Sequence, residues 1–378
     1  MNWIRDNILK LIVFLFIAIV VIVVIVACSK KGGTVTPGVE SASGYNELEE
    51  KMQQAAINYT NRNTSLLPKT ENKPVKVKLD TLVKNRYIKE VHAIEDSSVT
   101  CSGYVEIEKT INKTYKYVPY LKCGNHYQTK TLSQYIIDNE PLQTTDEGLY
   151  KDGNGYVFKG EFPRNHIVID DVNYRILSIT EEGYIKLIRE KRTKKRYLWD
   201  NRYNKEINKY YGINTDFGKT RMEDNLYFLF KNEDEEQGEV FLTRRLKNRI
   251  VKYDYCIGKR KSTDNDIKSE SECKETFSSY IGLINVSDYY KASTSSDCNY
   301  TNNLSCNNYN YLFGFDYDVF VTFNASDDNT YSYNVIDGGT IEQSRCNYGY
   351  YLYPVVYLNS NVTRSSGTGT PTDPYYVR

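Results

Sequence analysis

Residues Val99 to Cys123, VTCSGYVEIEKTINKTYKYVPYLKC, contain the clearest pair of strands in the chain. Apolar and polar side chains alternate over 99–108 and again over 115–123, and a polar turn separates the two runs. This alternation predicts a β-hairpin with one buried face. Cys101 and Cys123 lie at the open end of the hairpin, so we predict a disulfide between them.

Helices are expected on both sides of this hairpin. Apolar side chains recur at helical spacing upstream of it, which predicts an amphipathic helix over 46–61 with Asn46 and Glu49 as a capping box. A short helix is expected over 79–85 and another over 131–139. Together these elements predict a small helix-plus-hairpin domain over 45–140.

The rest of the chain predicts a second, larger domain over 149–378. Short strands are expected at 156–159, 167–170, 174–180, 184–190, 334–336, 351–358 and 375–377, and helices at 221–230 and 239–248. The first four strands suggest a meander. The fold class predicted for the whole chain is therefore α+β.

The N-terminal segment predicts attachment to a membrane. Residues 11–27, LIVFLFIAIVVIVVIVA, carry no charge and span about 26 Å as a helix. We therefore predict a cytoplasmic tail over 1–10, a transmembrane anchor or lipoprotein signal over 11–28, and a linker over 29–44. Cys28 follows a small residue, as in a bacterial lipobox. An uncleaved anchor and a lipoprotein with lipid on Cys28 both remain open.

The eight cysteines indicate the compartment of the body. None has the paired spacing of a zinc site, and local spacing suggests disulfides Cys256–Cys273 and Cys298–Cys306, with Cys346 left over. Disulfides are typical of proteins outside a reducing cytosol. We therefore expect a cell-membrane protein whose body is extracytoplasmic. The alternative is a cytoplasmic protein with buried free thiols.

Sequence motifs for catalysis are missing. The three histidines are isolated from one another, and no nucleophile elbow, P-loop or dinucleotide-binding glycine motif occurs. Paired carboxylates such as Asp327 and Asp328 are adjacent in sequence, which favours a solvated turn over a calcium loop. We predict no catalytic residue, metal or cofactor. A net charge of +1 also argues against a nucleic-acid partner.

One segment combines basic and aromatic residues. Lys186 to Lys209 carries ten Lys or Arg residues, a charge pattern that suits anionic wall polymer or lipid headgroups unless it forms a solvated hairpin tip. Within it, Trp199, Asp200, Arg202 and Tyr203 form a candidate binding cluster for sugars or peptides. The alternative, which we favour for Trp199, is a core tryptophan beside an internal Asp–Arg pair.

Longer sequence words point to known families. A long helix followed by LLPKT at 66–70, LDTLVKNRYI at 79–88 and YLKCG at 120–124 resembles the globular part of pilin-like proteins, although no pilin processing site is present. YLWDNRYN at 197–204, IGLINVSDYYKAS at 281–293 and the closing PVVYLNSNV are similar to a family of membrane-anchored extracellular proteins of low-GC Gram-positive bacteria, whose activity is unknown. This resemblance implies a larger domain with a C-type-lectin-like, formylglycine-generating-enzyme-like fold, but transfers no activity.

These observations leave three hypotheses for function. The first is a non-enzymatic binding or adhesion module at the cell envelope, with a cell-wall glycan or an envelope protein as partner. The second is a pilin-like component of a secretion or envelope assembly. The third is an envelope enzyme with an unrecognised site.

Overall fold

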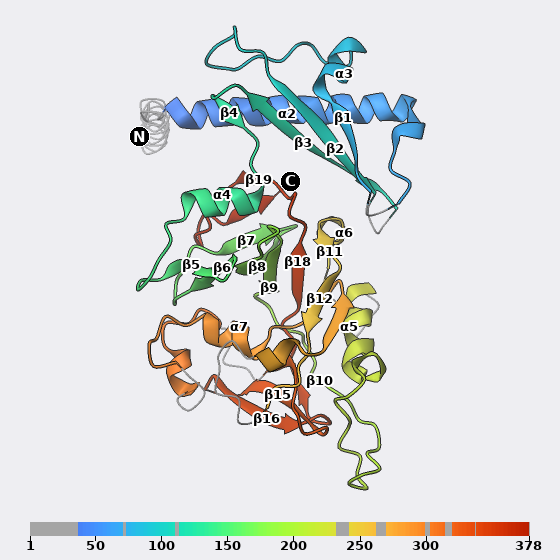
Figure 1. Ribbon diagram of the computed structural model, residues 1–378, viewed down its shortest axis with the longest axis vertical. Helices are drawn as coiled ribbons and strands as arrows, with labels where there is room; N and C mark the ends of the chain where they lie inside the picture. Colours follow the sequence, from blue (N-terminus) through green and yellow to red (C-terminus); the bar gives the residue numbers. More distant parts are fainter. Residues whose placement is uncertain are drawn as a thin grey trace, which may run out of the picture.

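The computed structural model describes residues 37–70, 73–109, 113–231, 242–261, 270–298, 303–313, 320–336 and 338–377. The predicted anchor over 11–28 and Cys28 lie outside the described residues. In the described part of the chain, no helix combines the length and the apolar character needed to cross a membrane. The chain is a mixed α+β protein whose smaller unit lies at one end of the long axis of the molecule (Figure 1).

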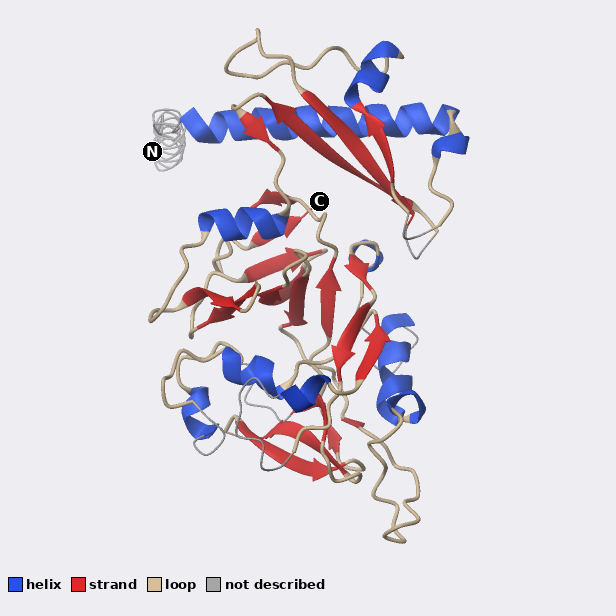
Figure 2. Ribbon diagram, in the orientation of Figure 1, coloured by secondary structure: helices blue, strands red, loops and turns tan. Residues whose placement is uncertain are grey.

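The smaller unit consists of a long helix laid across an antiparallel sheet (Figures 1 and 2). The strand order is β1-β2-β3-β4, and β2 pairs with β3 as the predicted hairpin. Its elements are α2 (Pro37–Arg62), η1 (Thr64–Leu66), β1 (Val75–Lys78), α3 (Leu79–Lys84), β2 (Ser102–Lys109), β3 (Tyr115–Cys123) and β4 (Tyr127–Gln128).

Helix α2 extends further than the sequence predicts. It begins at Pro37, so residues 37–44 are helical and do not belong to a linker. Proline suits the first helical position because its missing N–H has no partner there in any helix. Asn46 therefore lies inside the helix and forms no capping box. Glu49 is instead fully buried, and its carboxylate accepts hydrogen bonds from the Tyr127 hydroxyl at 2.9 Å and from Thr129.

Helix α4 (Leu132–Asn139) belongs to the larger unit, which corrects the predicted domain boundary. Leu132 and Ile136 are fully buried in the hydrophobic core of the larger unit, separate from the core formed by α2 and β1–β4. The Leu132 amide also donates to the Val362 carbonyl at 2.7 Å. The boundary between the units therefore lies near Lys130, before α4 rather than after it.

The larger unit is built on a nine-stranded sheet. Its path runs β11-β18-β9-β8-β7-β20-β19, and β5 and β6 attach where β6 pairs with β8. The four strands predicted as a meander correspond to β6, β7, β8 and β9, but only β7, β8 and β9 are successive neighbours, because β6 pairs with β5 and β8 and not with β7. The strands are β5 (Gly148–Asp152), β6 (Gly155–Lys159), β7 (His166–Ile169), β8 (Val172–Ile179), β9 (Ile185–Arg189), β11 (Ile250–Val251), β18 (Val355–Leu358), β19 (Arg364–Ser366) and β20 (Tyr375–Val377).

Smaller elements complete the larger unit, and its three-stranded sheet lies on the side away from α2 (Figure 1). The three-stranded sheet is formed by β14 (Phe320–Ala325), β15 (Tyr331–Ile336) and β16 (Thr340–Arg345). Two short pairs are β10 (Tyr197–Leu198) with β17 (Gly349–Tyr350) and β12 (Tyr253–Cys256) with β13 (Thr276–Ser279). The helices are η2 (Phe217–Lys219), α5 (Arg221–Lys231), α6 (Arg244–Lys247), η4 (Glu270–Cys273), α7 (Val286–Lys291) and η5 (Asn303–Asn307).

Three disulfides join the cysteine pairs that their spacing predicts. One lies in the smaller unit and closes the β2–β3 hairpin, and two close loops of the larger unit. The pairs are Cys101–Cys123, Cys256–Cys273 and Cys298–Cys306. Cys346 is a buried free thiol. Desolvation of this thiol raises its pKa well above the ordinary range, so it is not a reactive thiolate at neutral pH.

The two units also meet through polar groups around Asn361. Its side-chain amide donates to the carboxylates of Glu106, at 3.2 Å, and Glu108, at 2.5 Å. Its side-chain oxygen accepts from the Lys116 ammonium at 3.3 Å, and its main-chain carbonyl accepts from the Tyr120 hydroxyl at 3.3 Å. A single residue of the larger unit thus binds the outer face of the β2–β3 hairpin.

Candidate binding surface

The segment between β10 and α5 carries the candidate cluster and extends away from the larger unit, at the end of the molecule opposite α2 (Figure 1). Trp199 and Asp200 at its start are each 1% exposed. The Trp199 ring packs edge-on against Phe217, with ring centroids 5.5 Å apart. These two residues therefore cannot contact a ligand at the surface, which corrects the prediction that they bind one and agrees with the structural interpretation of Trp199.

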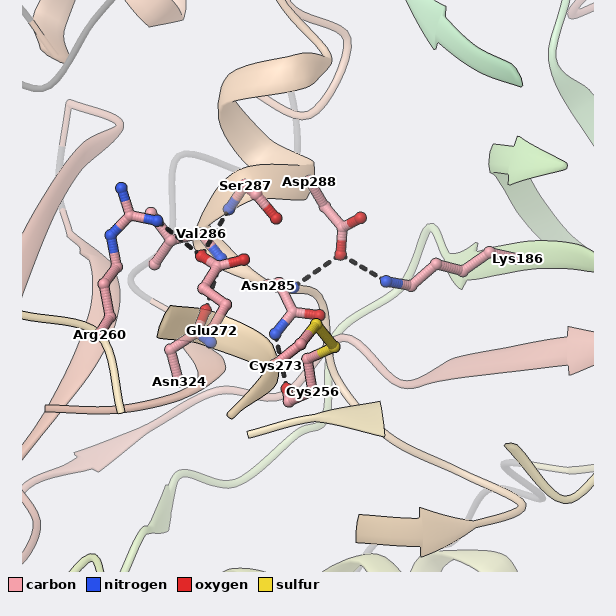
Figure 3. Close-up of a disulfide and its surroundings, with 10 residues drawn as sticks. All are labelled: Lys186, Cys256, Arg260, Glu272, Cys273, Asn285, Val286, Ser287, Asp288 and Asn324. Carbon is pink, nitrogen blue, oxygen red and sulfur yellow. Dashed lines mark hydrogen bonds and ion pairs between the residues drawn. A yellow bond between two sulfur atoms is a disulfide. The ribbon is translucent and has the colours of Figure 1, made fainter. Parts of the chain in front are cut away.

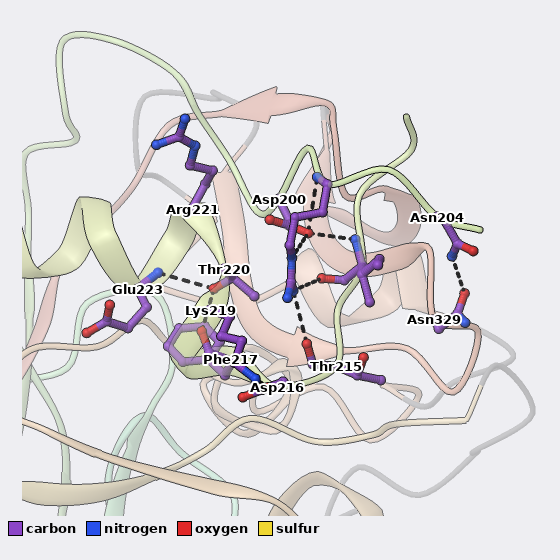
Figure 4. A network of polar contacts seen from close by, with 12 residues as sticks. Asp200, Asn204, Thr215, Asp216, Phe217, Lys219, Thr220, Arg221, Glu223 and Asn329 are labelled. Atoms are coloured by element: carbon purple, nitrogen blue, oxygen red, sulfur yellow. Dashed lines mark hydrogen bonds and ion pairs between the residues drawn. The ribbon is translucent and has the colours of Figure 1, made fainter. Parts of the chain in front are cut away.

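Asp200 and Arg202 fix the base of the segment, where Figure 4 shows Asp200 near Thr215. One Asp200 carboxylate oxygen accepts from the Arg202 Nε at 2.7 Å and from the Ile213 amide at 2.8 Å. The Arg202 guanidinium then donates to the carbonyls of Ile213 and Thr215. The pair crosslinks the outgoing and returning strands of the segment, because each residue binds both sides of it. Charge-assisted bonds of this kind are stronger than neutral ones.

Gly212 and Asn214 hold the returning side against the core. Gly212 has a φ of +80°, and a Cβ there would lie 2.3 Å from the Asp200 carbonyl oxygen. No residue but glycine fits this position without moving the backbone. The buried Asn214 amide donates to the carbonyls of Ser326, Asp328 and Tyr331 at 2.8, 2.7 and 2.7 Å. The segment is thereby joined to the turn between β14 and β15.

The tip of the segment forms a small hairpin of its own. The amides and carbonyls of Asn204 and Lys209 pair at 2.8 and 3.3 Å. Asn329, in the turn between β14 and β15, accepts a hydrogen bond from the Asn204 amide at 3.0 Å and donates one to the Glu206 carboxylate at 2.8 Å. Asn347 donates to the Tyr210 carbonyl at 3.0 Å. Residues 202–212, which we name the tyrosine loop, are therefore held in one conformation by their neighbours.

Two aromatic side chains of the tyrosine loop face solvent. Tyr203 is 39% exposed and Tyr210 is 70% exposed, and their ring centroids lie 4.9 Å apart. Ile207 between them is 42% exposed. Tyr203 is thus the one member of the candidate cluster that has both an exposed side chain and an aromatic neighbour at the surface. Tyr210 was missed by the sequence analysis, although a tyrosine within a run of polar residues is a signal for it.

The basic stretch before the loop is distributed differently from the predicted solvated tip. Lys186 and Arg189 belong to β9 and are buried, and the Lys186 ammonium lies 2.6 Å from the Asp288 carboxylate. The guanidinium groups of Arg192 and Arg196 lie against the Tyr351 ring, at 3.7 and 5.1 Å from its centroid. Some basic side chains of the stretch are therefore buried and others contact an aromatic ring, so the stretch does not form one continuous cationic surface.

The surroundings of the Cys256–Cys273 disulfide are structural in character (Figure 3). Arg260 and Glu272 form an ion pair at 2.8 Å with side chains 1% and 4% exposed. The Glu272 carboxylate also accepts from the Ser287 amide at 3.0 Å. Desolvation raises the pKa of Glu272 although the Arg260 charge opposes this shift. Such a pair, closed off from solvent, orders the loops around α7.

Metal-binding chemistry finds no support in the described part of the chain. There, no group of three or more His, Cys, Asp or Glu side chains is placed to hold a metal ion. The polar groups of the Asp327–Asn329 turn form internal hydrogen bonds, since the Asp328 carboxylate accepts from the Thr330 amide at 2.9 Å.

Comparison of the chain with protein-family models, curated proteins and solved structures gives no significant match.

Proposed function

We propose that this protein is a non-enzymatic binding module displayed on the outer side of the cell membrane, and that its tyrosine loop binds a glycan of the cell wall. Residues 11–28 would anchor it, with Cys28 as the lipid-bearing residue if the anchor is processed. The smaller unit would then lie near the membrane and the tyrosine loop far from it.

The observation that carries this proposal is the pair of adjacent exposed tyrosine rings on a rigid loop. Aromatic rings at the surface bind sugars through their flat apolar faces, and a loop fixed in advance loses little conformational entropy on binding. Tyr203 and Tyr210 provide two such faces beside each other. The exposed Asn208 and Lys205 lie on the same loop, where the Asn208 side-chain oxygen accepts from the Tyr203 hydroxyl and its Nδ2 and the Lys205 ammonium supply polar donors.

The disulfides support the proposed location. Three bridges in one chain are characteristic of oxidising surroundings, because cytosolic thiols are kept reduced. Protease added to intact, wall-stripped cells tests the orientation directly. Digestion of the body after Lys31 supports an external location, whereas full protection of the body rejects it.

Binding is tested by pulldown of purified wall glycan with the full chain in detergent. The double variant Tyr203→Ala, Tyr210→Ala should lose most of the captured glycan at an unchanged melting temperature, because both side chains are exposed. Tyr227→Ala is the matched control, since Tyr227 is 50% exposed on α5, outside the loop. Equal capture of glycan by the double variant and the wild type would reject the loop as the binding surface. Capture of an envelope protein instead of glycan would reject the glycan as the partner.

A second candidate function rests on the smaller unit. A long helix across a four-stranded antiparallel sheet is the arrangement expected of a pilin-like component, and this supports a role in a secretion or envelope assembly. Purification of the native complex in mild detergent distinguishes the two candidates. A defined set of secretion proteins bound to the smaller unit favours the assembly role, and a monomer that binds glycan favours the first.

For the larger unit, we propose the C-type-lectin-like arrangement that the sequence resemblance implies. Long loops joined to short strands, as in the tyrosine loop that follows β10, support it. An experimental structure of the larger unit tests it through the strand order, and a connectivity unrelated to that fold would remove the proposal.

A further inference from the structure

A second surface of the larger unit has the form of a binding site. A pocket of about 650 Å³ lies between two stretches that are distant in sequence. One contributes residues 145–147 and 161–162, before β5 and after β6, and the other contributes residues 294–297 and 308–309, before and after η5. A volume of this size is in the range of small-molecule sites. It is formed by residues other than those of the tyrosine loop.

The two walls of the pocket are joined to each other. The Gly160 amide donates to the Ala292 carbonyl at 2.9 Å, and the Tyr311 amide donates to the Gly160 carbonyl at 2.7 Å. The Cys298–Cys306 disulfide closes the second wall, and the Ser293 hydroxyl bonds across it to the Asn308 carbonyl at 2.7 Å. The walls therefore keep their spacing without a ligand.

An aromatic side chain from each wall is exposed at this pocket. Phe162 is 69% exposed and Tyr309 is 63% exposed. Phe162 gains little from packing in this position, because most of its side chain remains in contact with water. Exposed rings on opposite stretches of one concave surface are what a flat or cationic ligand requires.

The polar lining selects the charge of the ligand. Carboxylates come from both walls, namely Asp146, Glu147, Glu161 and Asp297, and none of the described residues that line the pocket is basic. One oxygen of Glu147 accepts from the Phe162 amide at 2.8 Å, which fixes that carboxylate beside the ring. The pocket therefore favours a cation and disfavours phosphate or carboxylate groups.

We infer that this pocket binds a sugar that carries a free amino group. The carboxylates pair with the ammonium, and the Phe162 and Tyr309 rings contact the apolar faces of the sugar ring. The hydroxyl groups of Thr294 and Ser295, which also line the pocket, match the hydroxyl groups of a sugar. A lysine side chain would use the carboxylates and the rings but would leave this hydroxyl lining without a function.

The inference is independent of the proposed role of the tyrosine loop. Loop and pocket share no residue, so each can be altered alone. Variants Tyr203→Ala and Tyr210→Ala should leave binding in the pocket unchanged, and pocket variants should leave the loop unchanged. Failure of one site can therefore be separated from failure of the other.

The test is calorimetric titration of the full chain in detergent with the tetramer of glucosamine and, separately, with its fully N-acetylated form. We expect the amino form to bind at least tenfold more tightly, because acetylation removes the positive charge. Phe162→Ala and Glu161→Gln should each weaken binding of the amino form by about tenfold, in the range known for cation–π and charged contacts. Both side chains are exposed, so the melting temperature should not change.

Matched controls separate a site from general attraction between opposite charges. Glu50→Gln removes the same charge at an exposed position of α2, and Tyr227→Ala removes an exposed ring outside the pocket. Neither should weaken binding. The inference is overturned if the amino tetramer does not bind, if both tetramers bind equally, or if Glu50→Gln weakens binding as much as Glu161→Gln. It is also overturned if tetralysine binds more tightly with the same dependence on Phe162 and Glu161.

Discussion

At the scale of single residues, Trp199 and Tyr203 show how four positions separate a core side chain from a surface one. Trp199 packs against Phe217 with 1% of its surface exposed, whereas Tyr203 shares the surface with Tyr210. The side chains between them, Asp200 and Arg202, are engaged with each other. Among the aromatic residues of the segment, Trp199 thus contributes to stability, and Tyr203 and Tyr210 form the proposed binding surface.

The first prediction follows from this division. Trp199→Ala should lower the free energy of unfolding by about 3–5 kcal/mol, because it leaves a cavity beside Phe217 in a well-packed core. The melting temperature should fall by roughly 10 °C. Thermal unfolding followed by circular dichroism measures this. Trp199→Phe, which fills much of the volume, should be considerably milder, and an Ala variant as stable as the wild type would show that the ring is not part of the core.

The second prediction concerns the buried pair of Arg260 and Glu272. Glu272→Ala removes the carboxylate that lies 2.8 Å from the Arg260 guanidinium, in a site where neither side chain reaches water. Loss of one partner of a buried pair typically costs about 3–5 kcal/mol. The double variant Arg260→Met, Glu272→Leu should recover a large part of that loss. A double-mutant cycle from denaturant unfolding decides it, and additive effects would mean that the two residues do not interact.

At the scale of elements, local patterns predicted nine of the twenty strands that the described residues form. The alternation over 99–123 correctly predicted β2 and β3. The spacing of the cysteines correctly predicted the three disulfides of the described residues. The prediction of the domain boundary failed because it depends on contacts distant in sequence. Helix α4 follows the smaller unit along the chain, yet its apolar face packs in the larger unit. The local sequence of α4 does not indicate in which of the two cores its apolar face is buried.

The candidate sites were predictable to a smaller extent. The segment that carries the tyrosine loop was found, because it combines Trp, Arg and Tyr within a few residues. Burial of Trp199 and exposure of Tyr210 depend on which neighbours the fold supplies, so the sequence could not separate them. The pocket lined by Phe162 and Tyr309 has no sequence motif, since its two walls are brought together by the hydrogen bonds of Gly160.

The third prediction uses the position of α4. A fragment over 130–378 should fold cooperatively by itself, whereas a fragment over 142–378 should be less stable or insoluble, because it exposes the site that Leu132 and Ile136 fill. Calorimetric melting of both fragments tests this. The double variant Leu132→Ala, Ile136→Ala in the longer fragment should also lower its melting temperature. If the two fragments were equally stable, the domain boundary would lie after α4, as the sequence alone suggested.

At the scale of the whole molecule, Asn361 links the two units through groups that titrate. The Glu108 carboxylate and the Lys116 ammonium both reach this side chain, with Glu106 on the same face. Burial raises the pKa of Glu108, in spite of the nearby Lys116 charge. Burial also lowers the pKa of Lys116 to about 8, although the charge of Glu108 opposes this shift, and the charge of Arg249 acts in the same direction as burial. Keeping Glu108 and Lys116 charged in this contact therefore costs free energy, and that cost depends on pH.

The last prediction is that the free energy of unfolding increases as the pH rises above 8, because of the lowered pKa of Lys116 at this contact. An unfolded chain keeps Lys116 protonated up to its ordinary pKa of 10.5, whereas the folded chain releases the proton near 8. Between these values the unfolded state binds more protons, so the free energy of unfolding rises with pH, by at most about 1.4 kcal/mol per pH unit for one group. Denaturant unfolding from pH 7.5 to 9.5 measures the slope. Lys116→Met keeps the length of the side chain and removes the titration, so its curve should be flatter than that of the wild type. Parallel curves would mean that Lys116 ionises in the folded protein as it does in water, and that the link between the units does not respond to its proton.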